Sequence, residues 1–213
     1  MSYSIKEVFY SLQGEGFHSG RAAIFCRFSK CNLWTGREAD RANAVCQFCD
    51  TDFIGTDGQN GGKFANAEAL CQHLMKFWPD NNTQPFVVLT GGEPLLQVDS
   101  ALIDRLHHHN FEIAIETNGT KNAPKGIDWV CMSPKANAPI ILDKGNELKL
   151  VYPQAQLMPE QVADLEFDFF YLQPMDDADP KIQQANVKAA LEYCLKHPKW
   201  QLSLQTHKLL GID

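Results

Sequence analysis

The sequence has no long apolar run and no excess of positive charge. Its longest apolar stretches are short, such as Phe86-Val87-Val88-Leu89, whereas a membrane-spanning helix needs about 18 apolar residues. Lys and Arg number 19 against 26 Asp and Glu, and proteins that bind a nucleic-acid backbone or an anionic membrane usually present a basic face. The first residues lack the basic and apolar segments of a secretory signal. We therefore expect a cytoplasmic soluble protein that binds neither nucleic acid nor membrane.

Internal repeats, low-complexity tracts and shifts of composition that would mark a second domain are also absent from the sequence. Hydrophobic residues make up 44% of the 213 positions and charged residues 21%, which is close to the average for soluble globular proteins. A chain of this length can bury a sizeable core in one domain. We therefore expect residues 1–213 to form a single domain.

What the sequence does contain is an alternation of strand and helix patterns. Helices are predicted after the N-cap residues Asn66 and Asp99 and over residues 180–195. Strands separated by helices favour an α/β fold with a mostly parallel sheet, whose chemistry lies at the carboxyl ends of the strands. Residues 29–65 show no periodicity and predict a long loop, which at this length is usually functional or partly disordered. Segments rich in β-branched and aromatic residues predict strands at 5–10, 22–28, 86–90, 111–116, 129–132, 148–152, 167–172 and 201–204.

The seven cysteines fall into two groups. Their number is odd and nothing indicates export, so a disulfide framework is not expected. Four lie singly in apolar stretches and are expected to be small buried hydrophobic residues: Cys26, Cys71, Cys131 and Cys194. The other three lie in the polar loop with the spacing C-x14-C-x2-C: Cys31, Cys46 and Cys49. An x2 pair of thiolates can bind one metal or cluster through a tight turn, so these three predict a metal centre.

The nature of that centre stays open on spacing alone. Three thiolates leave one coordination position unfilled. A structural zinc site would be closed by a fourth ligand, which Asp50 or a remote His could supply. An iron–sulfur cluster is the second alternative, and three unrelated cysteines are the third.

Two other segments end predicted strands with residues suited to a ligand. In Thr90-Gly91-Gly92-Glu93-Pro94 the glycines let the backbone approach a ligand closely, although a tight turn would also explain them. Gln13, Gly14 and Glu15 supply donors and acceptors for a flat heterocycle, or else form a β-turn with a solvated acid.

Arg27 interrupts an otherwise apolar strand. Its guanidinium must find an anionic partner or reach water, and its fork geometry suits a carboxylate. That carboxylate belongs either to a substrate or to an internal salt bridge, and the neighbours in sequence offer no partner. Asp50-Thr51, directly after the third cysteine, is a possible helix N-cap pair.

The GGEP segment together with the three cysteines resembles the radical S-adenosylmethionine superfamily. Further motifs resemble the 7-carboxy-7-deazaguanine synthase family and run in order from residue 10 to residue 208. They are YSLQGEG at 10–16, FCRF at 25–28, CQFCDT at 46–51, ETNG at 116–119, SPK at 133–135 and QTHK at 205–208. The superfamily's usual spacing is C-x3-C-x2-C, so the chain is similar to a subgroup with a longer cluster loop.

The resemblance implies an incomplete TIM-type barrel with mostly parallel strands and few helices. It implies a carbon–nitrogen lyase that converts 6-carboxytetrahydropterin to 7-carboxy-7-deazaguanine with loss of ammonia, in the biosynthesis of queuosine-type 7-deazapurines. The implied cofactors are a 4Fe–4S cluster, S-adenosylmethionine and Mg²⁺. The implied partners are an electron donor such as flavodoxin and, because dimers are usual in the family, a second copy of the chain.

The resemblance also assigns residues. Cys31, Cys46 and Cys49 would hold the cluster, Thr51 the magnesium ion, and Glu116 and Arg27 would be catalytic. The substrate would contact Leu12, Gln13, Gly14, Glu15, Arg27 and Thr90. S-adenosylmethionine would contact Phe48, Gly91, Gly92, Glu93, Asn118, Ser133, Pro134, Lys135, Gln173, Pro174, Met175 and Asp176.

Two other functions share some of these features. An activating enzyme for a glycyl-radical protein would have the same cysteine and GGEP logic, but it would need a peptide-binding surface. Arg27 with the SLQGEG segment favours a small carboxylated substrate instead. A zinc-stabilised binding module without chemistry is the remaining alternative.

Overall fold

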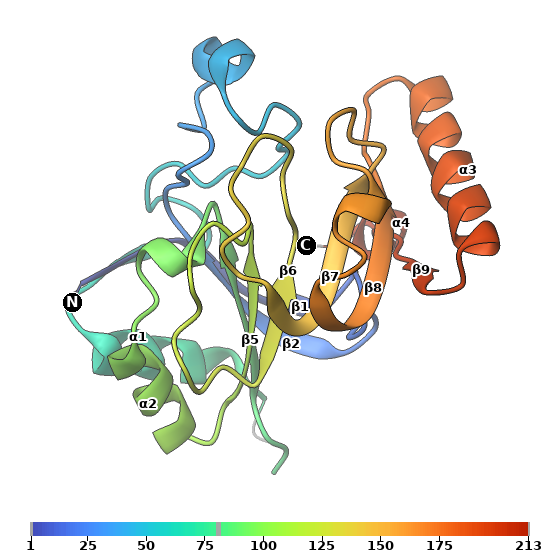
Figure 1. Ribbon diagram of the computed structural model, residues 1–213. Coiled ribbons are helices and arrows are strands. Elements are labelled where there is room, and N and C mark those ends of the chain that lie inside the picture. Colours follow the sequence, from blue (N-terminus) through green and yellow to red (C-terminus); the bar gives the residue numbers. More distant parts are fainter. Residues whose placement is uncertain (1, 80–81, 213) are drawn as a thin grey trace.

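The structure is a computed structural model that describes residues 2–79 and 82–212. Its strands are β1 (Tyr3–Leu12), β2 (Ala22–Phe28), β3 (Gly62–Phe64), β4 (Phe86–Gly91), β5 (Glu112–Thr117), β6 (Trp129–Met132), β7 (Lys144–Tyr152), β8 (Glu166–Pro174) and β9 (Trp200–Leu202). They form one nine-stranded sheet in the order β3-β1-β2-β4-β5-β6-β7-β8-β9 (Figure 1). β1 is antiparallel to β2 and to β3, and every pairing from β2 to β9 is parallel.

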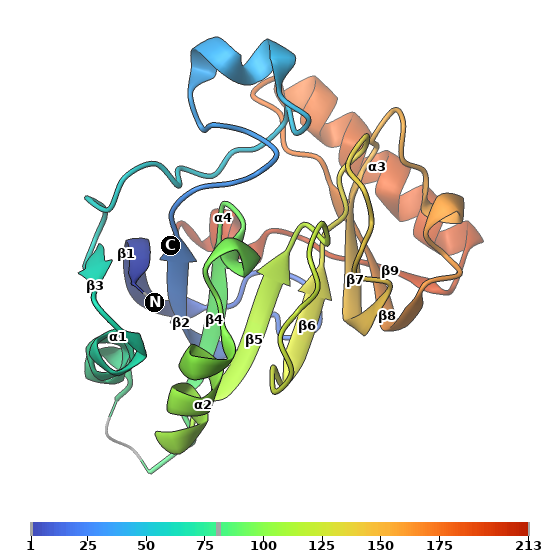
Figure 2. The ribbon, with the colours of Figure 1, turned by 60° about the vertical axis from the view of Figure 1, so that its left-hand side comes forward.

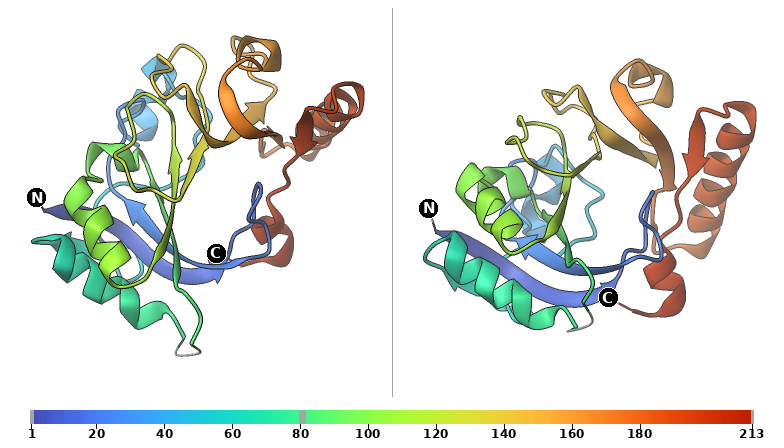
Figure 3. Two further views of the ribbon diagram at one scale, coloured as in Figure 1. Left: turned by 60° about the horizontal axis from the view of Figure 1, so that its bottom comes forward. Right: turned by 90° about the horizontal axis from the view of Figure 1, so that it is seen from below.

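The sheet is curved and remains open. Viewed from below, it bends into an arc, and the last helix, α4 (Thr206–Leu210), returns toward the loop between β1 and β2 (Figure 3). There the backbone N–H of Thr206 donates to the carbonyl of Gly14 at 2.9 Å. The predicted incomplete TIM-type barrel with mostly parallel strands is confirmed.

Three longer helices cover the outside of this arc. α1 (Ala67–Leu74) and α2 (Ser100–His108) pack below the first strands, and α3 (Pro180–Lys196) lies against β7, β8 and β9 (Figure 2). The predicted N-caps are present, because the side chains of Asn66 and Asp99 accept from the backbone N–H groups of Ala69 and Leu102. The remaining helical turns are η1 (Glu38–Asn43), η2 (Met75–Phe77), η3 (Pro94–Leu96) and η4 (Pro159–Gln161).

Alternation along the strands separates an outer apolar face from an inner one. In β4, Val87 and Leu89 pack outward against the helices, whereas Phe86 and Val88 point inward. The inward residues near the strand starts close the bottom of the arc as a small apolar cluster of Ala23, Phe86, Val88 and Ala114. Inward residues near the carboxyl ends of the strands are therefore left to line a cavity.

The sequence missed structure mainly inside the long loop. Residues 29–65 contain η1 and the edge strand β3, neither of which has apolar periodicity. The predicted bounds of β2 and β6 are confirmed, whereas β7 begins at Lys144 rather than 148 because its first residues are polar. Across residues 2–79 and 82–212, no helix combines the length and apolar character that a membrane span requires.

Candidate active site

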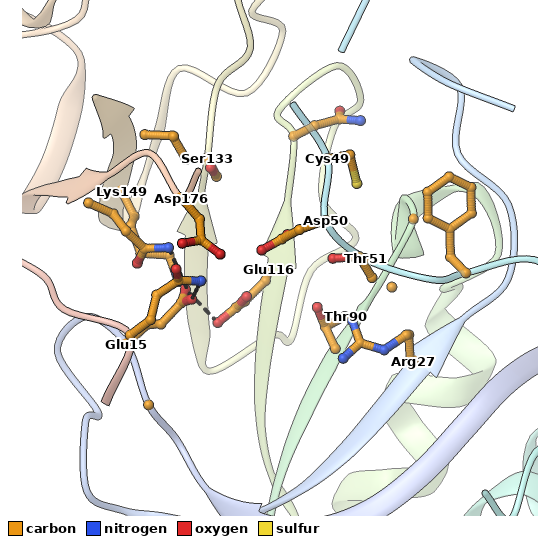
Figure 4. A pocket seen from close by; sticks show the side chains of 18 of the residues that line it. Glu15, Arg27, Cys49, Asp50, Thr51, Thr90, Glu116, Ser133, Lys149 and Asp176 are labelled. Carbon is orange, nitrogen blue, oxygen red and sulfur yellow. Dashed lines mark hydrogen bonds and ion pairs between the residues drawn. The ribbon is translucent and has the colours of Figure 1, made fainter. Parts of the chain in front are cut away.

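The carboxyl ends of the parallel strands surround a cavity of about 430 Å³. This volume lies within the range of about 300–1,000 Å³ that is usual for small-molecule sites. Arg27 on β2, Thr90 on β4, Glu116 on β5 and Lys149 on β7 all point into it, as expected from their positions on the inner face (Figure 4). Residues far apart in the sequence therefore share one site.

Most of the predicted site residues line this cavity: Leu12, Gln13, Gly14, Glu15, Arg27, Cys31, Cys46, Phe48, Cys49, Thr51, Thr90, Gly91, Gly92, Glu116, Asn118, Ser133, Lys135, Gln173, Pro174, Met175 and Asp176. Glu93 and Pro134 are not among the lining residues, and their contact with S-adenosylmethionine stays a prediction. The Glu93 carboxylate is fully buried behind the cavity, where it accepts from Leu95 N, Thr117 Oγ1 and Asn118 N at 2.8–2.9 Å. It joins the turn after β4 to the end of β5.

The two glycines of the GGEP segment serve a close backbone contact. A Cβ atom at Gly91 would lie 2.2 Å from the carbonyl oxygen of Phe28, and one at Gly92 would lie 2.2 Å from that of Lys30. The N–H of Gly92 donates to Phe28 O at 3.2 Å. Gly91 and Gly92 thus allow the end of β4 to press against the segment that leads into Cys31.

The three loop cysteines face the same cavity as free thiols. The side chains of Cys46 and Cys49 are hydrogen-bonded to each other, which lowers the pKa of the Cys49 thiol to about 6 and raises that of Cys46. Burial raises the pKa of Cys31, whose sulfur accepts from the N–H of Leu33 at 3.4 Å.

These thiols fit a 4Fe–4S cluster better than a single ion. Within residues 2–79 and 82–212, no three His, Cys, Asp or Glu side chains are grouped so that they could hold one metal ion. The thiolates of a four-iron cluster bind different irons, so they need to surround a space rather than meet at a point. Cys31, Cys46 and Cys49 all line one cavity, as the ligands of such a cluster would.

Residues 32–45, the insertion that lengthens the spacing between the first two cysteines, pack over the cysteines. Trp34 is buried and lines the cavity, and the guanidinium of Arg41 lies 4.1 Å from the centre of its ring. The same guanidinium donates from Nη1 to the carbonyls of Gln47 at 2.9 Å and Cys49 at 3.0 Å. Arg41 therefore links the insertion to the turn that carries the second and third cysteines.

A buried lysine and two carboxylates form another part of the cavity. Lys149 Nζ lies 2.6 Å from a Glu15 oxygen and 3.3 Å from a Glu116 oxygen. Gln13 donates to Glu116 at 3.0 Å, and Gln173 donates to Glu15 at 3.0 Å. The alternative of a solvated acid in a β-turn is therefore wrong for Glu15. Sequence reasoning missed Lys149, although a lone lysine in the apolar segment 148–151 is the same signal that singled out Arg27.

Arg27 has an internal partner that its sequence neighbours did not reveal. Its Nε donates to Glu7 Oε1 at 2.7 Å, because β1 and β2 pair with Glu7 opposite Arg27. Among the described carboxylates, Glu7 is the one that pairs with Arg27. Figure 4 shows Arg27 beside Thr90, on the opposite side of the cavity from Glu15 and Lys149. The guanidinium thus faces the cavity while one of its N–H groups is held from behind.

Asp50 and Thr51 do not cap a helix, since no helix begins there, and that alternative is wrong. Asp50 is paired instead with the C-terminal helix, where Lys208 Nζ lies 2.8 Å from Asp50 and 2.5 Å from Asp176. On the other side of the cysteines, Lys135 donates to the carbonyl and hydroxyl oxygens of Ser133. Burial lowers the pKa of Lys135.

Several curated proteins match this chain over its whole length. A 7-carboxy-7-deazaguanine synthase of Caulobacter vibrioides is 59% identical over 212 residues, and one of Bordetella pertussis is 57% identical, with 100% of each chain covered in both cases. The chain belongs to the 7-carboxy-7-deazaguanine synthase family. A family member from Nitratidesulfovibrio vulgaris is 52% identical over 215 residues, again with 100% of both chains covered. The search of family models found no match.

The fold agrees with a solved structure. The crystal structure of QueE from Escherichia coli superposes with a TM-score of 0.72 at 27% identity, covering 96% of this chain and 94% of that one. Membership of the 7-carboxy-7-deazaguanine synthase family implies the radical S-adenosylmethionine chemistry and the 4Fe–4S cluster. Family membership therefore favours the synthase over the two alternatives, a zinc-stabilised module and an activating enzyme for a glycyl-radical protein.

Proposed function

We propose that the chain, acting as a single domain, converts 6-carboxytetrahydropterin to 7-carboxy-7-deazaguanine with loss of ammonia. The observation that carries the proposal is one cavity that combines three free cysteines, a buried acidic group and an inward-facing arginine, in a chain 59% identical to a synthase of that name. The cysteines suit the iron–sulfur cluster, whereas the acidic group and the arginine suit the pterin. The product would feed the synthesis of queuosine-type 7-deazapurines.

The cysteine side of the cavity would hold the cluster and S-adenosylmethionine. When bound, a reduced 4Fe–4S cluster and S-adenosylmethionine supply a 5′-deoxyadenosyl radical that can remove a hydrogen atom from carbon. Cys31, Cys46 and Cys49 would bind three irons and leave the fourth open. Phe48, Asn118, Ser133, Lys135, and the segment Gln173, Pro174, Met175 and Asp176 would hold S-adenosylmethionine, together with the backbone of Gly91 and Gly92.

The opposite side of the cavity would orient the pterin. Glu15 and Glu116 present carboxylate oxygens, which suit the N–H groups of an aminopyrimidinone ring. Arg27 lies across the cavity from Glu15, and its Nη groups suit the carboxylate substituent of the pterin. Leu12, Gln13, Gly14 and Thr90 complete this part of the lining. Glu116 lies between Glu15 and Arg27 in Figure 4 and is the residue we propose to act on the reacting part of the ring.

We also propose a magnesium ion, an external electron donor and a second protomer, all three on the basis of the family resemblance. The hydroxyl of Thr51 lines the cavity, and magnesium keeps several waters and needs few protein ligands. A flavodoxin-type donor would deliver the electron. A homodimer is the expected assembly.

The proposal is tested with protein purified and reconstituted under anaerobic conditions. We expect iron and sulfide to be present and, with 6-carboxytetrahydropterin, S-adenosylmethionine and a reductant, 7-carboxy-7-deazaguanine and ammonia to form together. Omitting S-adenosylmethionine is the control and should stop product formation. Zinc in place of iron and sulfide, or cleavage of S-adenosylmethionine without pterin conversion under any condition, would refute the proposal.

A further inference from the structure

Lys149 is a buried cation that none of the family-like motifs contains. Its side chain is 5% exposed, on the inner face of β7, and its ammonium contacts both Glu15 and Glu116. Glu15 comes from the loop after β1 and Glu116 from β5. A single ammonium group therefore joins the two acidic residues that face the pterin side of the cavity.

Titratable groups surround Lys149 on several neighbouring elements, and Tyr171 is its pairing partner on β8. Glu147, two residues earlier on β7, and Cys131 on β6 lie on the same inner side, and Lys135 is another cation that interacts with Lys149. Burial raises the pKa of Glu147. His207 approaches Glu15 from α4. Among the described residues, Lys149 is the one cation that forms an ion pair with Glu15 or Glu116.

We propose that Lys149 is a positioning residue for substrate recognition: its ammonium group holds the carboxylates of Glu15 and Glu116 side by side, as two acceptors for the N–H groups of the flat substrate. This inference rests on the proposed function, because it assigns a specificity role within the same cavity. Lys149 itself does not need to touch the substrate.

The physical reason is the cost of placing two carboxylates in one site where their side chains are only 15% and 24% exposed. When two carboxylates share a site without a cation, the pKa of one is strongly raised. Burial raises the pKa of Glu15, but the charge and hydrogen bond of Lys149 outweigh this and lower it to about 2, with help from Gln205. Without Lys149, Glu15 would take up a proton and present a donor where the substrate needs an acceptor.

The test compares Lys149→Met with Lys144→Met, which makes the same substitution at an exposed position of the same strand. In the holoenzyme, Lys149→Met should keep its iron content and its pterin-independent cleavage of S-adenosylmethionine. Its affinity for 6-carboxytetrahydropterin at pH 7 should fall by about thirtyfold or more, as expected when one partner of a buried charge pair is removed. Lys144→Met should match the parent protein in all three measurements.

The pH dependence separates this role from a purely structural one. The acid limb of kcat/KM should move to higher pH in Lys149→Met and in Lys149→Gln, whereas Lys149→Arg, which keeps the charge, should leave the limb in place. When Glu15→Gln is already present, adding Lys149→Met should reduce pterin affinity by less than it does in the parent protein. Lys149→Gln serves as the neutral variant if Lys149→Met does not fold.

Two results would overturn the inference while the parent enzyme turns over normally. One is parental pterin affinity and an unmoved acid limb in the neutral variants. The other is an equal shift of the limb in Lys149→Arg and Lys149→Gln. Failure of the parent enzyme to bind or convert the pterin would instead count against the proposed function, so the two failures are distinguishable.

Discussion

The cavity has two walls that are built in different ways. The cysteine wall, made of Cys31, Trp34, Cys46, Phe48 and Cys49, belongs to a part of the long loop that contains no strand, and it is held by backbone contacts and Arg41. The carboxylate wall, made of Glu15, Glu116, Lys149 and Gln173, is carried mainly by β5, β7 and β8. The entropic cost of closing a loop rises only slowly with its length, so the cysteine wall tolerates an insertion. The second depends on strand register, where a shift of one residue would turn Lys149 to the outer face.

The largest effect that we expect is on the cysteine wall. Replacing Cys31, Cys46 or Cys49 by Ala removes a cluster ligand, and each variant should lose S-adenosylmethionine cleavage altogether. Iron content and formation of 5′-deoxyadenosine in the anaerobically reconstituted protein check this. Three thiolates are the fewest that hold the cluster with one iron open.

The matched controls are cysteines outside the cavity. Cys26, Cys71 and Cys194 do not line it, and their Ala variants should keep the iron content of the parent. Cys26 and Cys71 are fully buried, so these two should lose some thermal stability even though the cluster stays. A fourth cysteine that proved equally essential for cleavage would refute the open-iron assignment.

The next largest effect concerns Arg27, which faces the carboxylate wall across the cavity. If its guanidinium meets the substrate carboxylate, Arg27→Ala should weaken pterin binding by about two to four powers of ten, because breaking a buried ion pair costs about 3–5 kcal/mol. Arg27→Lys should recover only part of this, since an ammonium cannot make the planar two-point contact. Isothermal titration with the pterin measures the affinity, and formation of 5′-deoxyadenosine without substrate should persist.

The ion pair between Arg27 and Glu7 provides a control for the Arg27 variants. Glu7→Gln keeps Arg27 in place and removes only the charge behind it, so pterin affinity should stay much closer to that of the parent. Full-strength pterin binding by Arg27→Ala would show that Arg27 serves only its ion pair with Glu7.

The two walls also differ in how far the sequence predicted them. The order of strands and helices, the caps at Asn66 and Asp99, and the cysteine loop follow from local pattern and are confirmed or retained. The partners of Arg27 and Lys149 do not follow from local pattern. Glu7, the partner of Arg27, lies on the neighbouring strand β1, and strand register places it there. The partners of Lys149 are Glu15 in the loop after β1 and Glu116 on β5, and the curvature of the sheet brings them to β7.

Glu93 illustrates a different limit. As part of GGEP it predicted a ligand contact, yet its carboxylate is used by Leu95, Thr117 and Asn118. A motif shows that a residue matters but does not tell whether its side chain faces the ligand or supports the turn that does. The reverse holds for Trp34 and Arg41, which matter for the cysteine wall and belong to no motif.

A smaller effect is expected from the insertion itself. Arg41→Met would remove the cation over Trp34 and the hydrogen bonds to the carbonyls of Gln47 and Cys49. Interactions of these kinds contribute about 0.5–2 kcal/mol, so the cluster should form but should bleach faster in air. The visible absorbance of the cluster against time measures this. Arg37→Met changes an exposed arginine of the same loop and should bleach at the parent rate, and equal rates in both variants would deny Arg41 this role.

The smallest effect concerns Thr51, at the edge of the cysteine wall. If its hydroxyl is a ligand of magnesium, Thr51→Ala should require several-fold more magnesium for half-maximal turnover, because the ion keeps most of its coordination through water. Thr51→Ser retains the hydroxyl and should respond to magnesium like the parent. The cluster absorbance should be the same in all three proteins, since Cys31, Cys46 and Cys49 are unchanged. A magnesium titration of Thr51→Ala that superposes on the parent curve would leave Thr51 as a lining residue of the cavity without a metal-binding role.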